Sequence, residues 1–176
     1  ISGERPPRAG MAAFALAGGC VSLAFQPAAS RSCCWFSRSP EAWPPLIRAT
    51  GATLFAAVPS LMRQILKYAP PGPIDLGFLR HAMIAGEKPP EDLFEAWRAR
   101  TGLELYEALG MSEISTYIST SPSVPRKAGT AGKPQAGRRI VILPQEGGEQ
   151  PLPAGEEGLI AVHRSDPGLM LGYWNR

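Results

Sequence analysis

The chain has 176 residues, which is enough for one ordinary domain with a sizeable core. Apolar residues make up 44% and charged residues 19%, a globular balance that excludes a wholly disordered chain. The formal net charge is only +3, and the aromatic residues do not alternate with basic ones as a base-stacking surface requires. We therefore expect a globular domain, or part of one, that binds no nucleic acid.

The three cysteines point to no metal site and no disulfide framework. Cys20, Cys33 and Cys34 form no Cys-x-x-Cys pair, and no His lies near them in the sequence. We expect reduced thiols and a cytoplasmic location.

Residues 1–42 give no assignable element. An apolar run at residues 11–25, behind Arg5 and Arg8 and followed by small residues, resembles a secretory signal. It is shorter than the roughly 20 apolar residues that a membrane-spanning helix needs, so no membrane span is expected. Residues 30–39 have neither a helical nor a strand period, and their Arg, Pro, Ser and Cys content is consistent with a shifted reading frame. We expect this head to pack poorly on the rest of the chain.

Residues 43–124 alternate between strand and helix patterns. The apolar run at residues 53–58, bounded by Gly51 and Pro59, is typical of a strand buried on both faces. A second apolar strand is expected at residues 80–85 and a third strand at residues 103–107. Helices are expected at residues 46–51, 61–68 and 91–100, the second of them capped by Ser60. The pattern predicts an α/β fold in which the three strands lie parallel and adjacent in a helix-covered sheet. Such sheets bind ligands at the carboxyl ends of their strands.

Residues 125–176 have a β-rich pattern. Strands are expected at residues 139–143 and 158–162, joined by a segment rich in Gly, Pro and Glu, which predicts a small antiparallel β module. The chain thus divides into a head (1–42), an α/β part (43–124) and a β-rich part (125–176). Because it starts with Ile1 and ends without a polar tail, we expect a fragment.

The stretch Leu109-Gly110-Met111-Ser112-Glu113 is expected to be a loop that follows the third strand. Gly110 lets the backbone approach a ligand, Ser112 can donate to a phosphate oxygen, and Glu113 offers the hard oxygen that Mg²⁺ prefers. The same residues also fit a turn in which Ser caps a helix and Glu lies in its first turn. From the residues alone, both interpretations stay open.

A second candidate loop, Gly86-Glu87-Lys88, follows the preceding strand. Both loops would then lie at one edge of the sheet and form two sides of one crevice, whose backbone could bind the edge of a planar base. Alternatively, Glu87 and Lys88 are a solvated pair at the entrance to a helix.

No catalytic or ligand-binding role is expected for several other polar residues. The basic, glycine-rich residues 126–134 lack the order of a phosphate-binding P-loop, so a structured turn is expected there. His81 and His163 have no partner at ligand or triad spacing, and Ser60 lacks a nucleophile-elbow context.

Five short motifs, taken in order, carry a family resemblance. They lie at residues 57–60, 85–90, 106–113, 129–134 and 168–175. In this order and at this spacing they resemble the adenylate-forming superfamily of acyl-CoA synthetases, and most of all bacterial ligases for benzoate-type or other small carboxylic acids. The resemblance covers residues 43–176.

The resemblance implies an ATP-dependent acid–thiol ligase. A carboxylic acid would attack the ATP α-phosphate to give acyl-AMP and pyrophosphate, and coenzyme A would then displace AMP to form a thioester. Gly86, Glu87 and Lys88 would line the adenine, and the loop of Glu107, Ala108, Leu109, Gly110 and Met111 would lie between the adenine and the acyl group. Ser112 would bind the α-phosphate, and Glu113 would hold Mg²⁺.

Two departures accompany the resemblance. Leu109 stands where family members often carry an aromatic residue that stacks on adenine, so an aliphatic contact would replace the stacking. The family's upstream phosphate loop, its later ribose-binding Asp and its C-terminal domain with the catalytic Lys are not found in the sequence. The leading hypothesis is therefore a ligase fragment that is inactive alone. The alternative is a non-catalytic AMP-binding or interaction module, or a decayed gene product.

Overall fold

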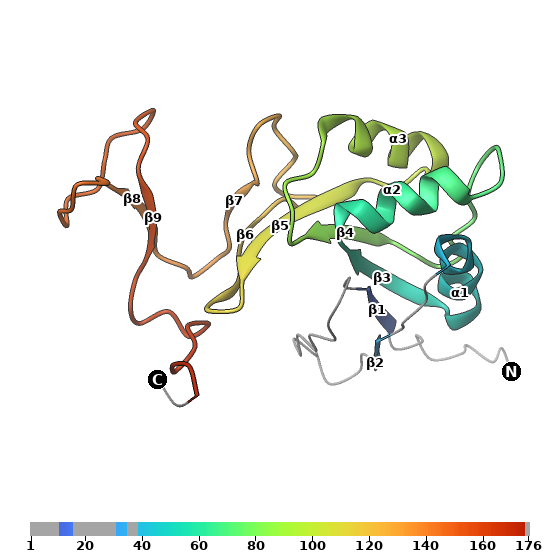
Figure 1. Ribbon diagram of the computed structural model, residues 1–176, viewed down its shortest axis with the longest axis horizontal. Coiled ribbons are helices and arrows are strands. Elements are labelled where there is room, and N and C mark those ends of the chain that lie inside the picture. The colour runs from blue at the N-terminus through green and yellow to red at the C-terminus, as the bar shows by residue number, and fades with distance from the viewer. Residues whose placement is uncertain (1–10, 16–30, 35–38, 175–176) are drawn as a thin grey trace, which may run out of the picture. The chain divides into compact units, whose positions relative to one another are not determined.

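A computed structural model describes residues 11–15, 31–34 and 39–174 of the chain (Figure 1). The chain divides into two compact units, Ile1–Glu107 and Ala108–Arg176. The division falls inside strand β5 (Leu105–Met111) and not at residue 124, where the sequence pattern changes.

The first unit is built on a parallel sheet. Its strands are β1 (Met11–Ala15), β2 (Arg31–Cys34), β3 (Ala52–Ala57) and β4 (His81–Ala85), and the spatial order is β2-β1-β3-β4, followed by the start of β5. The pairs β1–β2, β1–β3 and β3–β4 are all parallel. The predicted α/β class and the adjacent, parallel placement of β3 and β4 are confirmed.

Strands β1 and β2 correct the expectation that residues 1–42 contribute no element. Phe14 lies opposite Cys34 on one side and opposite Ala56 on the other, so β1 is paired along both of its edges. Strands of 5 and 4 residues are too short to show a period by themselves, which is why the sequence gives no signal for them. Most of the supposed signal at residues 11–25 lies outside the described residues, and the shifted reading frame stays a prediction.

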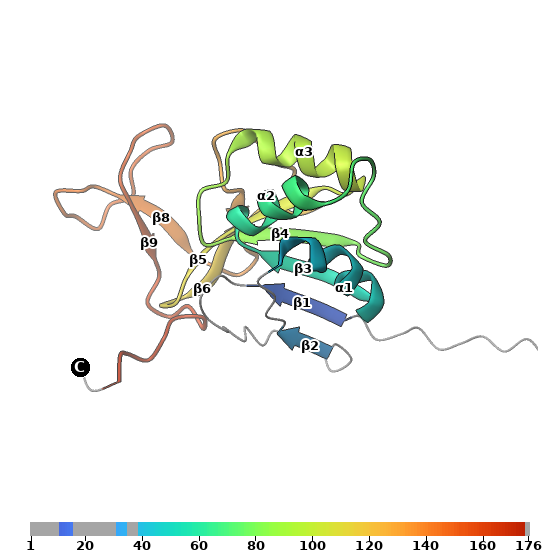
Figure 2. The same ribbon diagram turned by 45° about the vertical axis from the view of Figure 1, so that its right-hand side comes forward.

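In the described residues of this unit, three α-helices accompany the sheet: α1 (Trp43–Thr50), α2 (Pro59–Tyr68) and α3 (Glu91–Thr101), with the 3-10 turn η1 (Pro40–Ala42) before α1. Figures 1 and 2 show α2 and α3 side by side over one face of the strands. Gly102 ends α3 in the left-handed conformation, as its position in the sequence predicts. None of the helices in the described part of the chain has the length and apolar composition needed to cross a membrane.

Ser60 does not cap α2, contrary to the expectation from the sequence. The helix begins at Pro59, and Val58 is the residue before its first turn. Proline suits the first helical position because its fixed φ matches the helix and that position needs no N–H donor. The Ser60 hydroxyl is therefore left to make a different contact, described below.

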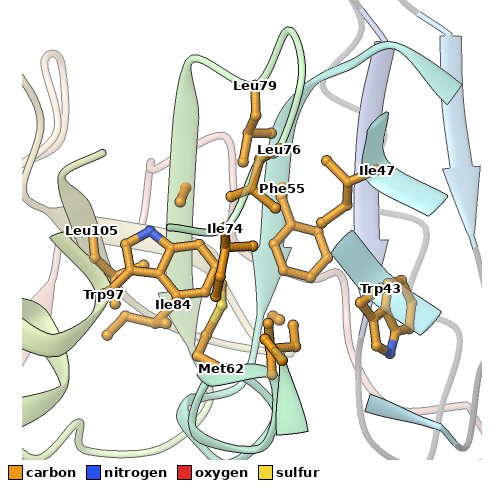
Figure 3. Packing of buried hydrophobic residues seen from close by; sticks show 14 of the residues in the cluster. Trp43, Ile47, Phe55, Met62, Ile74, Leu76, Leu79, Ile84, Trp97 and Leu105 are labelled. Carbon is orange, nitrogen blue, oxygen red and sulfur yellow. The ribbon is translucent and has the colours of Figure 1, made fainter. Parts of the chain in front are cut away.

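The core of the first unit lies between the sheet and the helices (Figure 3). Trp97 of α3, Met62 of α2 and Phe55 of β3 are each fully buried there. Trp43 packs on Phe55, their ring centroids 5.6 Å apart.

The second unit consists of antiparallel strands. Within it the later part of β5 pairs with β6 (Ser115–Ser119), and β6 pairs with the short β7 (Lys133–Pro134). The separate pair β8 (Ile140–Leu143) and β9 (Leu159–Val162) confirms the predicted antiparallel module.

Candidate functional site

The first candidate segment, Gly86 to Lys88, follows β4 directly. Ala57 lies opposite Ile84 in the parallel pair, so β3 and β4 end at the same edge. Gly86 has φ +91°, a conformation that glycine adopts without strain, and a Cβ there would lie 3.5 Å from Val58 Cγ1. Gly86, Glu87 and Lys88 are all exposed, so their polar groups are accessible to a ligand.

A hydrogen bond joins the exits of β3 and β4. The Ser60 hydroxyl donates to Glu87 Oε1 over 3.3 Å. Glu87 therefore contacts the first turn of α2 while it stays exposed. The sequence gives no signal for this contact, because the two residues are 27 positions apart.

The second candidate segment is a hairpin, not the loop that the sequence predicts. Strand β5 continues to Met111, and after a tight turn β6 begins at Ser115. The register shifts between Leu109 and Gly110, so the hairpin contains a β-bulge. Gly110 is required there because a Cβ would lie 2.6 Å from the Ser115 carbonyl oxygen. The glycine thus allows two backbones to approach each other, a role that local sequence cannot distinguish from a flexible loop.

Ser112 and Glu113 lie in the turn at the tip of this hairpin. Ser112 and Met111 are exposed, Glu113 is half-buried, and the next side chain, Ile114, is buried. The alternative in which Ser112 caps a helix is wrong, because β6 and not a helix follows the turn. Both side chains have the chemistry to bind phosphate and a hard cation, but their roles stay predictions.

Glu113 has a partner that the sequence does not reveal. The Tyr173 hydroxyl donates a hydrogen bond to Glu113 Oε1. This bond, together with one from the backbone of Glu113 itself, lowers the pKa of the Glu113 carboxyl below its ordinary value. The same contact raises the pKa of Tyr173, because ionising the phenol would remove the donor and place two negative charges together. Glu113 is therefore a carboxylate at neutral pH.

The side chains suit a magnesium ion only in combination with phosphates. Among the residues that the structure describes, no three His, Cys, Asp or Glu side chains gather at one place. Mg²⁺ commonly binds through one or two carboxylates while substrate phosphates and water fill its other positions. The single carboxylate of Glu113 fits that arrangement and does not form a cage of its own.

Neither histidine has a catalytic setting. The ring of His81 stacks on Tyr106, with centroids 4.4 Å apart, and burial lowers the pKa of His81. His163 Nδ1 contacts Arg139 Nη2 and Ser165 Oγ, at 2.6 and 2.8 Å. The latter contacts order an exposed turn after β9.

A comparison with known protein families shows which family the chain belongs to. The sequence model of the family described as "AMP-binding enzyme" matches residues 8–174. The chain belongs to this family. The match begins within the first 42 residues, where the sequence alone shows no resemblance, and so includes both β1 and β2.

Three proteins similar to this chain are CoA ligases or acyl-coenzyme A synthetases by name. The 3-hydroxybenzoate–CoA ligase of Aromatoleum sp. (strain CIB) is 29% identical over 123 residues, covering 70% of this chain and 23% of that protein. Human mitochondrial acyl-coenzyme A synthetase ACSM5 is 38% identical over 84 residues, covering 48% of this chain and 14% of that protein. The anthranilate CoA ligase AuaEII, solved with anthranoyl-AMP, superposes with a TM-score of 0.68 at 26% identity, covering 82% of this chain and 28% of that one. The chain thus spans less than a quarter of the length of these two curated relatives.

Proposed function

We propose that the chain is part of the nucleotide-binding domain of an ATP-dependent carboxylic acid–CoA ligase. The observation that carries the proposal is the hairpin tip, where an exposed serine and an ionised glutamate, Ser112 and Glu113, follow a strand of an AMP-binding fold. One curated relative described above is a CoA ligase by name and the other an acyl-coenzyme A synthetase, which supports this reaction over other uses of AMP.

The proposed reaction has two steps. A carboxylate oxygen of the acid attacks the α-phosphorus of ATP, and the bond from that phosphorus to the pyrophosphate oxygen breaks. The thiol sulfur of coenzyme A then attacks the acyl carbonyl carbon, the thiol proton is lost to solvent or a base, and AMP leaves. Negative charge at phosphorus must be neutralised in the first step, and a bound Mg²⁺ would supply part of that neutralisation.

The residues take the roles that the family resemblance implies. Gly86, Glu87 and Lys88 line the adenine, and residues 107–111 run between the nucleotide and the acyl group. The Ser112 hydroxyl donates to the α-phosphate. Glu113 is the protein's carboxylate ligand for Mg²⁺. Leu109 is half-buried in β5 and gives an aliphatic contact where an aromatic one is common.

The substrate class that we propose is a small, benzoate-type acid. The names of two similar proteins, a 3-hydroxybenzoate–CoA ligase and an anthranilate CoA ligase, support it. A cytoplasmic location is proposed because the three cysteines lack the spacing of a zinc site or a disulfide framework. Because the human relative is mitochondrial, cell fractionation is needed to test that location.

The alternative is a non-catalytic AMP-binding or interaction module, or a decayed gene product. The chain covers only 23% and 14% of the two curated relatives, so residues outside it are expected to be needed for the complete reaction. We therefore expect the 176-residue chain to be inactive by itself.

Pyrophosphate release tests the proposal. The longest natural protein that carries this sequence is incubated with ATP, magnesium and benzoate, 3-hydroxybenzoate or anthranilate, and benzyl alcohol serves as the control without a carboxylate. We expect release that depends on the acid, and a hydroxamate when hydroxylamine traps the acyl-AMP. If AMP binds but no acid stimulates release, the non-catalytic alternative is correct.

A further inference from the structure

Residues 166–173, here called the clasp, contact the tip of the β5–β6 hairpin twice. The hydroxyl of Tyr173 donates to Glu113 Oε1. The backbone N–H of Met170 donates to the carbonyl oxygen of Glu113 over 2.8 Å. One residue of the hairpin is therefore held through both its side chain and its backbone.

The other end of the clasp is anchored by a buried ion pair. Asp166 Oδ1 lies 2.5 Å from Arg138 Nη1, and the Asp166 side chain is only 1% exposed. The same Oδ1 accepts a hydrogen bond from the Gly168 N–H at 2.8 Å. A Cβ at Gly168 would lie 2.6 Å from Arg138 Nη1 and 2.9 Å from the carbonyl oxygen of Ile114, so the clasp runs close against the residue that follows Glu113.

Apolar burial does not hold Tyr173 in place. Tyr173 is 55% exposed as a residue, and its neighbours Leu171 and Trp174 are 109% and 91% exposed. The hydroxyl contact is thus not a by-product of core packing. It depends on the polar contacts of the clasp and on the Glu113 carboxylate itself.

We propose that Tyr173 is a positioning residue for Glu113, and that the clasp orients this carboxylate toward the divalent cation that accompanies ATP. The inference rests on the proposed function, because it takes Glu113 as the cation ligand. A carboxylate on a freely rotating side chain must be ordered before it can ligate. A hydrogen-bond donor on one carboxylate oxygen holds the side chain in place before the metal binds. Loss of such a partner typically weakens metal affinity about 10- to 100-fold.

Manganese binding tests the role without relying on turnover. Mn²⁺ replaces Mg²⁺ as the probe, and free Mn²⁺ is measured by electron paramagnetic resonance in the longest natural protein that carries this chain, with α,β-methylene-ATP bound. Tyr173→Phe removes only the hydroxyl and should raise the Mn²⁺ dissociation constant about 10-fold. Tyr68→Phe is the matched control, because Tyr68 is a similarly exposed residue, at 53%, and lies in α2, where its ring contacts Lys67. It should leave the constant unchanged.

Two further variants separate failure of this inference from failure of the proposed function. Glu113→Gln should weaken Mn²⁺ binding, and adding Tyr173→Phe to it should have no further effect. If Glu113→Gln weakens binding while Tyr173→Phe leaves it at the parent value, the positioning role is wrong and the metal role stands. If neither variant changes binding, the metal role of Glu113 is wrong, and the inference fails with it.

A measurement on the 176-residue chain checks the contact itself. With ¹³C in the Glu side-chain carboxyl groups, Tyr173→Phe should shift the Glu113 resonance, whereas Tyr68→Phe should not. A resonance that does not move would contradict the proposal even if metal binding could not be measured. A lower melting temperature with unchanged Mn²⁺ affinity would also contradict it, because the tyrosine would then be only a structural tie.

Discussion

Arg138 and Asp166 form a buried ion pair in which Nη1 lies 2.5 Å from Oδ1, with side chains that are 16% and 1% exposed. Asp166 Oδ2 is buried as well and has no hydrogen-bond partner. The carboxylate therefore depends on Arg138 and on the Gly168 N–H, both at Oδ1, for its stabilisation. Because Asp166 begins the clasp, this pair determines where the residues that reach Glu113 start.

We expect substitution of Arg138 to lower the unfolding free energy more than substitution of Asp166. Arg138→Met leaves a buried carboxylate without its counter-charge, which costs about 3–5 kcal/mol of unfolding free energy. Asp166→Asn keeps an oxygen for the Gly168 N–H and leaves a guanidinium that water can still reach, so it should cost clearly less. Urea unfolding of both variants measures the difference. Equal losses, or a larger loss for Asp166→Asn, would contradict this interpretation of the pair.

Gly110→Ala should disrupt the β5–β6 hairpin. The added Cβ would lie 2.6 Å from the Ser115 carbonyl oxygen and 2.8 Å from Thr116 Cα, both of which are backbone atoms that cannot rotate away. Overpacking of this kind costs about 1–3 kcal/mol.

Gly51→Ala is the control for Gly110→Ala. Gly51 has φ +66°, and a Cβ there meets no atom within 4 Å, so only backbone strain is added. Amide hydrogen exchange should show lost protection in residues 115–119 for Gly110→Ala alone. Protection retained there in the Gly110→Ala variant would show that the bulge adapts.

His81 should make stability depend on pH. Its side chain is partly buried against Tyr106, and burial lowers its pKa from 6.5 in the folded protein. The unfolded chain then binds the proton more readily, so this contribution to stability is complete above about pH 6.5 and is lost as the pH falls toward the lower folded pKa.

His81→Phe keeps an aromatic ring on Tyr106 but has no proton to bind. The unfolding free energy of the variant should therefore fall less than that of the parent between pH 7.5 and pH 5. Parallel pH profiles for the two proteins would mean that His81 titrates alike in the folded and unfolded states.

The elements that the sequence predicts are those with a strong local signal. The apolar runs of β3 and β4 are bounded by Gly or Pro, and Gly102 follows the last turn of α3, so these elements could be located to within a few residues. By contrast, β1 and β2 are defined by pairing with distant strands, and β5 extends through Gly110 because β6 lies beside it. Non-local pairing of this kind leaves no periodic pattern in a short segment.

Some residues of the candidate site could be identified from the sequence, and others could not. Ser112 and Glu113 could be chosen in advance because their side-chain chemistry and their place after a strand are visible in the sequence. Tyr173 could not, because its contact with Glu113 joins residues 60 positions apart through a clasp held by backbone and ion-pair geometry. The placement of Gly86 relative to Gly110 stays a prediction.

The most direct test of the central claim is pyrophosphate release by a Glu113→Gln variant of the longest natural protein that carries this chain, at saturating ATP and magnesium. Glu146→Gln is the matched control, since Glu146 is exposed in the turn after β8. Because glutamine keeps the shape and removes the charge, we expect release to fall by at least about 10-fold, with little change in unfolding free energy, while Glu146→Gln stays at the parent rate. Release near the parent rate in Glu113→Gln would contradict the metal role and leave Glu113 as an ordinary turn carboxylate held by Tyr173.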